Sequence, residues 1–200
     1  NYPDSLLISV MSGNFVQRGE PAIHDKWERS KVAVENGIDL VVQLPTRFSN
    51  ASSYFFAHGA VEILNSLGVN LIAFGSEMGE LDKILRISDV LYANSSELNQ
   101  YAASRAKSGI SFPRARDEFI LDRFKDSIEW SEPKPSAGFL LSPNDILAID
   151  YILSSKSIGY EGGFFAVKRK GLEHNLSASI IRDDLYSQNP DLLKSLEERF

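Results

Sequence analysis

The feature that most constrains the fold is an alternation of short apolar runs with amphipathic segments. Three continuous apolar runs occur early in the chain, at residues 6–10, 39–42 and 71–74. Runs of this length without polar alternation are typical of strands that are buried on both faces. The segments between them have helical spacing and are followed by Gly37 and Gly68, where a left-handed helix cap fits. Strand, helix and strand in this order predict parallel βαβ crossovers and a doubly wound sheet.

The middle of the chain has a different pattern. Three helices without an intervening strand are predicted at residues 81–91, 97–107 and 116–125, which indicates a helical insertion. Residues 126–143 carry three prolines among polar residues and are typical of a linker or loop. The remaining predicted elements are a helix at 144–155, a strand at 163–168 and closing helices at 179–188 and 191–199. We therefore predict an α/β domain formed by residues 1–80 and 143–200, interrupted by an insertion and linker at 81–142.

Composition limits the class of protein. A chain of 200 residues with 43% hydrophobic content can bury a substantial core. Because it has no cysteine, disulfides and thiolate metal sites are excluded, and we predict no metal site. No apolar stretch reaches the roughly 20 residues that a membrane helix needs, so we expect no membrane contact and a cytoplasmic location. The net charge of -6 argues against broad electrostatic binding to nucleic acid.

The candidate binding residues follow the predicted strands. Ligands of open parallel sheets bind at the carboxyl ends of the strands, where helix N-termini present free N–H groups. The polar segments at these places are residues 11–21, 43–45, 74–77 and 167–171. Gly75 would let a phosphorylated ligand approach the backbone, and the guanidinium of Arg169 would pair with phosphate oxygens. The alternatives are an ordinary turn glycine and a solvated surface arginine.

Two predicted helix starts are further candidates. Ser179 opens a helix and Arg182 lies on its first turns, an arrangement that can hold phosphate through amides, a hydroxyl and a cation. The alternative is an ordinary serine cap with a surface arginine. Asn144 likewise begins a helix, and it is either a cap or a side chain that points at a base or ribose.

Two other groups of residues carry weaker indications. The histidines His24, His58 and His174 lack the spacing of a metal site or a catalytic triad, which favours surface or structural roles. The segment 105–125 has three acids and six basic residues, namely Arg105, Lys107, Arg114, Arg116, Arg123 and Lys125. We interpret it as a solvated helix face, with contact to RNA as the alternative.

Several longer motifs together resemble one known family. The string MSGNFVQRGEPA at residues 11–22 is long and specific, and it is followed by Asp25-Lys26-Trp27 and by DLVVQLP at 39–45. Supporting motifs occur in order at residues 74–77, 143–151, 167–169 and 177–182. Through these motifs nearly the whole chain resembles the tRNA(Met) cytidine acetate ligase family, within the HIGH-type nucleotidyltransferase superfamily.

The resemblance implies a Rossmann-like fold and an enzyme that activates acetate with ATP as acetyl-adenylate. The acetyl group would then pass to the wobble cytidine of elongator tRNA(Met). By motif match, Gly75, Asn144 and Arg169 would contact ATP, and Ser179 with Arg182 would form a second phosphate contact. Mg²⁺ would arrive with the nucleotide. These roles suit the chemistry, because attack on the α-phosphate depends on charge neutralisation by arginines and helix N-termini.

One element of that family is absent. The family begins with a strand and a loop that bears two histidines two residues apart, and this chain has no such pair. The resemblance therefore identifies no catalytic residue here. Because the chain opens at Asn1 without a methionine and reaches a strand within five residues, we expect it to be part of a longer protein. The histidine loop would precede it, and a part that grips tRNA would follow it.

Two alternatives to the ligase stay open from the sequence. One is a small-molecule adenylyl- or cytidylyltransferase of the same superfamily, which would share the ATP-binding residues. The other is a nucleotide- or RNA-binding module without catalytic activity. The motif at residues 11–22 favours the ligase, because we associate it with that family.

Overall fold

The described residues fold into two compact α/β units. The computed structural model describes residues 5–124 and 141–169, which divide into unit 1 (residues 5–69) and unit 2 (residues 70–124 and 141–169). Each unit contains a pair of parallel strands, with the order β1-β2 in the first and β3-β4 in the second. The predicted α/β class with parallel strand pairing is confirmed. The division at residues 80 and 142 stays a prediction.

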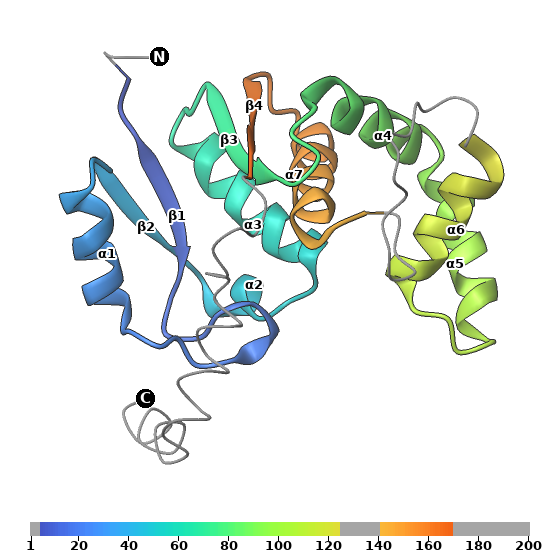
Figure 1. Cartoon of the computed structure of the whole chain (residues 1–200), viewed down its shortest axis with the longest axis horizontal. Helices are drawn as coiled ribbons and strands as arrows, with labels where there is room; N and C mark the ends of the chain where they lie inside the picture. Colours follow the sequence, from blue (N-terminus) through green and yellow to red (C-terminus); the bar gives the residue numbers. More distant parts are fainter. Residues whose placement is uncertain (1–4, 125–140, 170–200) are drawn as a thin grey trace. The chain divides into compact units, whose positions relative to one another are not determined.

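Unit 1 is built around strands β1 (Ile8–Ser12) and β2 (Leu40–Leu44), which pair with Ile8 opposite Leu40. Helix α1 (Lys26–Glu35) connects them and lies alongside β2 (Figure 1). A short 3-10 helix η1 and two helices complete the unit, at Gln17–Gly19, Thr46–Ser49 (α2) and Ser53–Ser66 (α3). Because β1 and β2 pair in parallel with α1 between them, the crossover predicted from the first two apolar runs is present, and helix α3 packs against β1.

Both ends of helix α1 follow from its sequence. The Asp25 carboxylate accepts hydrogen bonds from the backbone N–H groups of Trp27 (2.8 Å) and Glu28 (2.9 Å) and so caps the N-terminus. Gly37, just beyond the last turn, has φ +97°, a conformation that a side chain disfavours. These two residues limit the helix to Lys26–Glu35, which lies between the first two predicted apolar runs.

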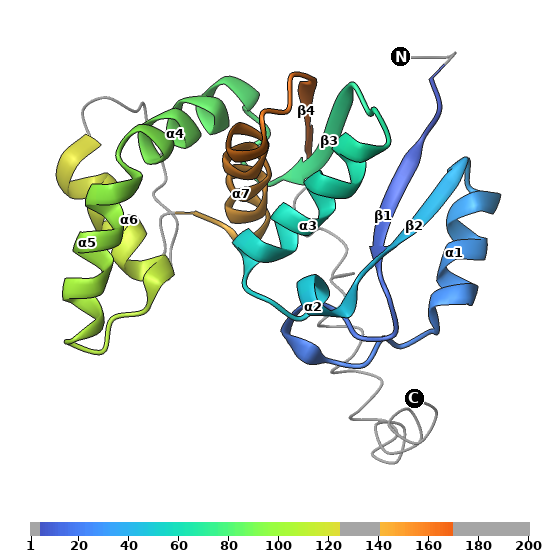
Figure 2. The same ribbon diagram turned by 180° about the vertical axis from the view of Figure 1, so that it is seen from behind.

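Unit 2 combines the second strand pair with four helices. Strands β3 (Leu71–Ser76) and β4 (Gly163–Lys168) pair in parallel, with Leu71 opposite Gly163. The helices are α4 (Leu81–Ala93), α5 (Ser95–Ala106), α6 (Phe112–Phe124) and α7 (Pro143–Ile158). Helix α7 packs on β3 and α4, while α5 lies against α6 (Figure 2). The helices expected between the third and fourth strands are therefore present, and α6 begins four residues before its predicted start.

The core of unit 2 is made of the inner helix faces together with Ile72 and Phe74 of β3. The predicted runs 6–10 and 39–42 of unit 1 are exposed or half-buried, so the expectation that they are buried on both faces is wrong. In unit 1 the fully buried side chains include Leu44, Ala57 and Val61. In unit 2 they include Ile84, Ile87, Leu91, Phe119, Ile120, Ile149 and Ile152. None of the helices in the described part of the chain combines the length and apolar character that crossing a membrane requires. The predicted closing helices at 179–188 and 191–199 lie outside the described residues, as does most of the linker at 126–143.

Candidate functional site

The carboxyl ends of β3 and β4 bring two predicted site residues together in unit 2. Gly75 pairs with Val167, and the backbone N–H of Arg169 donates to the carbonyl oxygen of Ser76 at 2.9 Å. A Cβ atom placed on Gly75 would lie 3.7 Å from Cγ and Cδ of Arg169, which is ordinary van der Waals contact. The stem of the arginine therefore runs past the bare backbone of Gly75, at the strand end where parallel sheets bind ligands.

Asn144 joins the same strand end from helix α7. Its side-chain Nδ2 donates to Oε1 of Glu77 at 2.5 Å, and Glu77 directly follows the last residue of β3. Asn144 is not the helix cap, because the residue that caps α7 is Ser142, whose Oγ accepts from the backbone N–H of Asp145. Of the two predicted roles for Asn144, the cap is therefore wrong. The three residues predicted to contact a nucleotide all lie at this end of unit 2.

A buried carboxylate fixes the two segments against each other. Asp145, with only 4% of its surface exposed, accepts from the hydroxyl of Ser76 (2.5 Å) and the backbone N–H of Met78 (3.2 Å). Its other oxygen lies 2.6 Å from the hydroxyl of Ser142. Ser76 lies in the predicted polar segment 74–77, whereas Asp145 was not among the predicted site residues. The spacing Ser142-x-x-Asp145 at a helix start was the available signal, because a residue three after the cap often bonds back to it.

Glu77 is charged at neutral pH in this setting. Partial burial by itself raises the pKa of Glu77, but hydrogen bonds from Ser142 and Asn144 and the positive charge of Arg169 together bring that pKa below its ordinary value of 4.5. The hydroxyl of Ser142 lies 2.5 Å from Oε2 of Glu77 as well as close to Asp145. Since a serine hydroxyl carries one proton, Ser142 donates to one of these carboxylates at a time.

This strand end, which we call the β3/β4 site, is suited to an anionic ligand with polar groups. Arg169 contributes a planar cation, and α7 contributes the positive end of a helix dipole. Lys168 is opposite Ser76 in the strand register, and the stem of its side chain lies against Gly79 rather than Gly75. A phosphate chain would be neutralised here, while Asn144 would offer a directional hydrogen bond.

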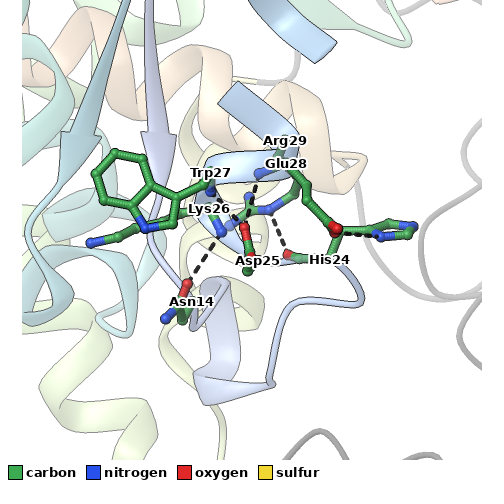
Figure 3. Close-up of polar contacts among 7 residues, drawn as sticks. All are labelled: Asn14, His24, Asp25, Lys26, Trp27, Glu28 and Arg29. Carbon is green, nitrogen blue, oxygen red and sulfur yellow. Dashed lines mark hydrogen bonds and ion pairs between the residues drawn. The ribbon is translucent and has the colours of Figure 1, made fainter. Parts of the chain in front are cut away.

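At the carboxyl end of β1 in unit 1, polar side chains bind backbone groups of the loop and of the start of α1. The Arg29 guanidinium donates to three backbone carbonyls, those of Ser12 (3.0 Å), Gly13 and His24 (3.0 Å). Asn14 Oδ1 accepts from the backbone N–H of Lys26 at 3.2 Å. Figure 3 shows Asn14 and Asp25 both pointing at the first turn of α1. The long motif at residues 11–22 is thus tied to the start of α1.

One cation of this region faces the neighbouring strand. Lys26 Nζ donates to Oε1 of Gln43 at 2.8 Å and lies 5.1 Å from the centre of the Trp27 ring. Trp27 itself is 72% exposed, so its ring is not part of the core of unit 1. A Cβ on Gly13 would approach Nε2 of Gln43 to 2.7 Å, and the glycine therefore leaves room for that amide.

The other sequence candidates are placed as follows. Ser179, Arg182 and His174 lie outside the described residues. His24 lies 3.1 Å from a carboxylate oxygen of Glu28, and His58 lies 3.4 Å from Glu62. Among residues 5–124 and 141–169, no three histidine, aspartate or glutamate side chains form a metal-binding group.

The basic segment 105–125 is largely paired with acids. Arg105 and Arg114 both contact Glu118, and Arg123 contacts Glu97 at 2.7 Å. Arg116 is buried, with 3% of its surface exposed, and contacts Asp117. The prediction of a solvated face is therefore wrong for Arg116, while Arg105, Arg114 and Arg123 form ion pairs within and between α5 and α6. Contact of this segment with RNA stays a prediction.

Comparisons with known proteins agree on one family. The profile of the HIGH nucleotidyl transferase family matches residues 1–199. The chain is 41% identical over 193 residues to the tRNA(Met) cytidine acetate ligase of Clostridium perfringens. The match covers 92% of this chain and 48% of that protein. It is 40% identical over 200 residues to the protein of the same name from Thermoanaerobacter sp., covering 96% and 47%. The chain spans about half the length of the curated relatives it matches.

Two solved structures are similar to this chain. The crystal structure of Thermotoga maritima TmcAL bound with alpha-thio ATP has a TM-score of 0.78 and 35% identity, covering 94% of this chain and 45% of that one. The apo form of the same protein has a TM-score of 0.77 and 33% identity, and the match covers 94% of this chain and 46% of that one.

Proposed function

Because the chain belongs to the HIGH nucleotidyl transferase family, we propose that it is the nucleotide-binding part of an ATP-dependent tRNA(Met) cytidine acetate ligase. A carboxylate oxygen of acetate would attack the α-phosphorus of ATP and displace pyrophosphate, which gives acetyl-adenylate. The exocyclic amine of the wobble cytidine of elongator tRNA(Met) would then attack the acetyl carbonyl. AMP leaves, and the amine loses a proton.

The observation that carries the proposal is the convergence of Gly75, Asn144 and Arg169 at the β3/β4 site. They belong to motifs that lie far apart in the sequence. The printed names of the relatives support the ligase activity, and the ATP analogue in the Thermotoga maritima structure supports nucleotide binding. The whole protein's activity remains a proposal, because the chain spans about half of these relatives.

Each residue of the site has a role that fits its geometry. Arg169 would pair with phosphate oxygens, and the N-terminus of α7 would add positive potential as charge develops on the α-phosphate. Asn144 would bind a polar group of the nucleotide, and Gly75 would keep the backbone open to it. We further propose that Ser179 and Arg182 contact the phosphates and that Mg²⁺ arrives with ATP. Catalytic residues are not assigned.

The remaining parts of the proposal concern the partners. Acetate and elongator tRNA(Met) are the proposed acyl donor and acceptor, and the cytoplasm is the proposed location because tRNA is modified there. Residues 81–142, which include α4, α5 and α6, are proposed as an insertion in the nucleotide-binding domain.

A labelling experiment tests the function. The full-length protein is incubated with ATP, labelled acetate and total tRNA, and the RNA is digested to nucleosides for mass analysis. Label in acetylcytidine that is lost in Arg169→Ala is the expected result. Pyrophosphate release with a small acceptor and no label in RNA would instead indicate a small-molecule nucleotidyltransferase. If neither product formed, the result would indicate a nucleotide- or RNA-binding module without catalytic activity.

A further inference from the structure

Two adjacent contacts join the end of β3 to the start of α7. The inner contact is buried and links Ser76 to Asp145, while the outer contact lies at the surface and links Glu77 to Asn144. The two contacts are adjacent on both segments, since Ser76 precedes Glu77 and Asn144 precedes Asp145. The outer pair is therefore held by a buried pair one residue away on both segments.

Both carboxylate oxygens of Glu77 face the start of α7. Oε1 accepts from the amide of Asn144, and Oε2 lies 2.5 Å from the hydroxyl of Ser142, whose one proton it shares with Asp145. The hydrogen bond from Asn144 and the adjacent hydroxyl both orient Glu77 toward this helix start. Positioning Asn144 is a role that these contacts support directly.

The chemistry of the two groups decides which atom of Asn144 faces a ligand. An ionised carboxylate only accepts hydrogen bonds, so the amide nitrogen of Asn144 must point at Glu77. The carbonyl Oδ1 is then the atom that the side chain presents to a ligand at the β3/β4 site. An oxygen acceptor at this place selects a ligand group that carries an N–H or O–H.

We propose that Glu77 is a positioning residue that fixes the amide of Asn144, so that Oδ1 accepts a hydrogen bond from a donor group of the bound nucleotide. The inference rests on the proposed function, because it takes the ligand to be ATP. The donor is either the exocyclic amine of the base or a ribose hydroxyl. Holding Asn144 in its binding orientation before the nucleotide arrives lowers the entropic cost of binding.

A double-mutant cycle in the full-length protein tests whether Glu77 acts through Asn144. ATP affinity is measured by calorimetry for wild type, Glu77→Ala, Asn144→Ala and the double variant. We expect each single variant to bind ATP about tenfold more weakly, as for the loss of one well-placed hydrogen bond. The double variant should be no weaker than Asn144→Ala. Additive losses of about 100-fold would overturn the inference.

A conservative variant separates hydrogen bonding from charge. Glu77→Gln can still accept from Asn144 through its carbonyl and can donate to Ser142, so it should bind ATP within about twofold of wild type. If Glu77→Gln is as weak as Glu77→Ala, the charge of Glu77 acts on Arg169 and the inference fails. Equal thermal midpoints of all variants exclude a loss of folding as the cause.

Nucleotide analogues identify the donor. Inosine triphosphate replaces the exocyclic amine by a carbonyl, and 2′-deoxy-ATP and 3′-deoxy-ATP each lack one hydroxyl. We expect wild type to bind one of these about tenfold more weakly than ATP, and Glu77→Ala to lose that preference. If Glu77→Ala kept the same preference among these nucleotides as wild type, the inference would be overturned while the proposed function would stand. If wild type bound no ATP, the proposed function would fail together with it.

Discussion

The two strand ends of this chain use their polar side chains in opposite ways. At the end of β1, the Arg29 side chain from α1 donates to the backbone carbonyl groups of Ser12, Gly13 and His24. At the end of β3 and β4, Arg169 bonds to the fold through its backbone N–H and carries its charged side chain past Gly75. The contacts of Arg29 are those of a structural cation, whereas Arg169 is the cation proposed to bind a ligand.

The difference teaches that a specific motif need not be the binding site itself. The string at residues 11–22 is the most distinctive part of the sequence, yet its described contacts hold a loop against α1. The β3/β4 site is marked by short motifs, and its polar groups are oriented by a buried carboxylate. Substitutions at the two ends should therefore have different effects on activity and stability.

The largest expected effect is the loss of activity in Arg169→Ala. Removing the cation that would stabilise charge at the phosphates should lower acetate-dependent ATP–pyrophosphate exchange by about 100-fold, while stability changes by less than about 0.5 kcal/mol. Lys168→Ala is the matched control, because it removes a cation from the adjacent position and should cost less activity. Equal losses in both variants would show that only the overall positive charge matters.

Arg29→Ala should show the reverse pattern. It leaves three backbone carbonyls without their charged donor, and we expect a loss of about 2 kcal/mol in the free energy of unfolding, measured with urea. Arg29→Lys should recover part of the loss. If ATP affinity fell in Arg29→Ala without any change in stability, the β1 end would also be a ligand site and the comparison would be wrong.

Three glycines sharpen the comparison at the level of the backbone. Gly79 has φ +67°, and a Cβ there would meet Cβ of Lys168 at 2.6 Å, so Gly79→Ala should destabilise the protein by about 1–2 kcal/mol. Gly109 has φ +76° with no atom within 4 Å, and Gly109→Ala should destabilise the protein by only about 1 kcal/mol, because alanine disfavours this backbone conformation but meets no neighbouring atom. Gly13→Ala in unit 1 should cost still less, because the amide of Gln43 can move. Denaturation midpoints that did not follow this order would contradict it.

The smallest expected effect is the pH dependence at Glu77. Since the pKa of Glu77 is lowered in the folded protein, its carboxylate stabilises the fold at pH values above its ordinary pKa of 4.5. That contribution is lost as the pH falls below 4.5 through the folded value. Comparing urea denaturation of wild type with that of Glu77→Gln at neutral and acidic pH measures it. A stability difference that stayed constant down the pH range would contradict the assigned contacts.

Much of the secondary structure was predictable from local pattern. The four described strands and the six longer helices occur where apolar runs and helical spacing placed them, because burial of continuous runs and glycine stops act over a few residues. The start of α6 differed, since its first turn contains Pro113, which a helix accepts there but which sequence patterns mark as a break. The candidate nucleotide contacts Gly75, Asn144 and Arg169 came from motif resemblance.

The sequence by itself determined the order of strands and helices and the family to which the chain belongs. Only the tertiary structure decided which polar side chains meet. The Ser76 hydroxyl reaches Asp145 across 69 positions and Asn144 reaches Glu77 across 67, and no local pattern encodes such pairs. The physical reason is that the packing of α7 on β3 brings the start of that helix to the carboxyl end of the strand, and a buried polar group must then find its partner there.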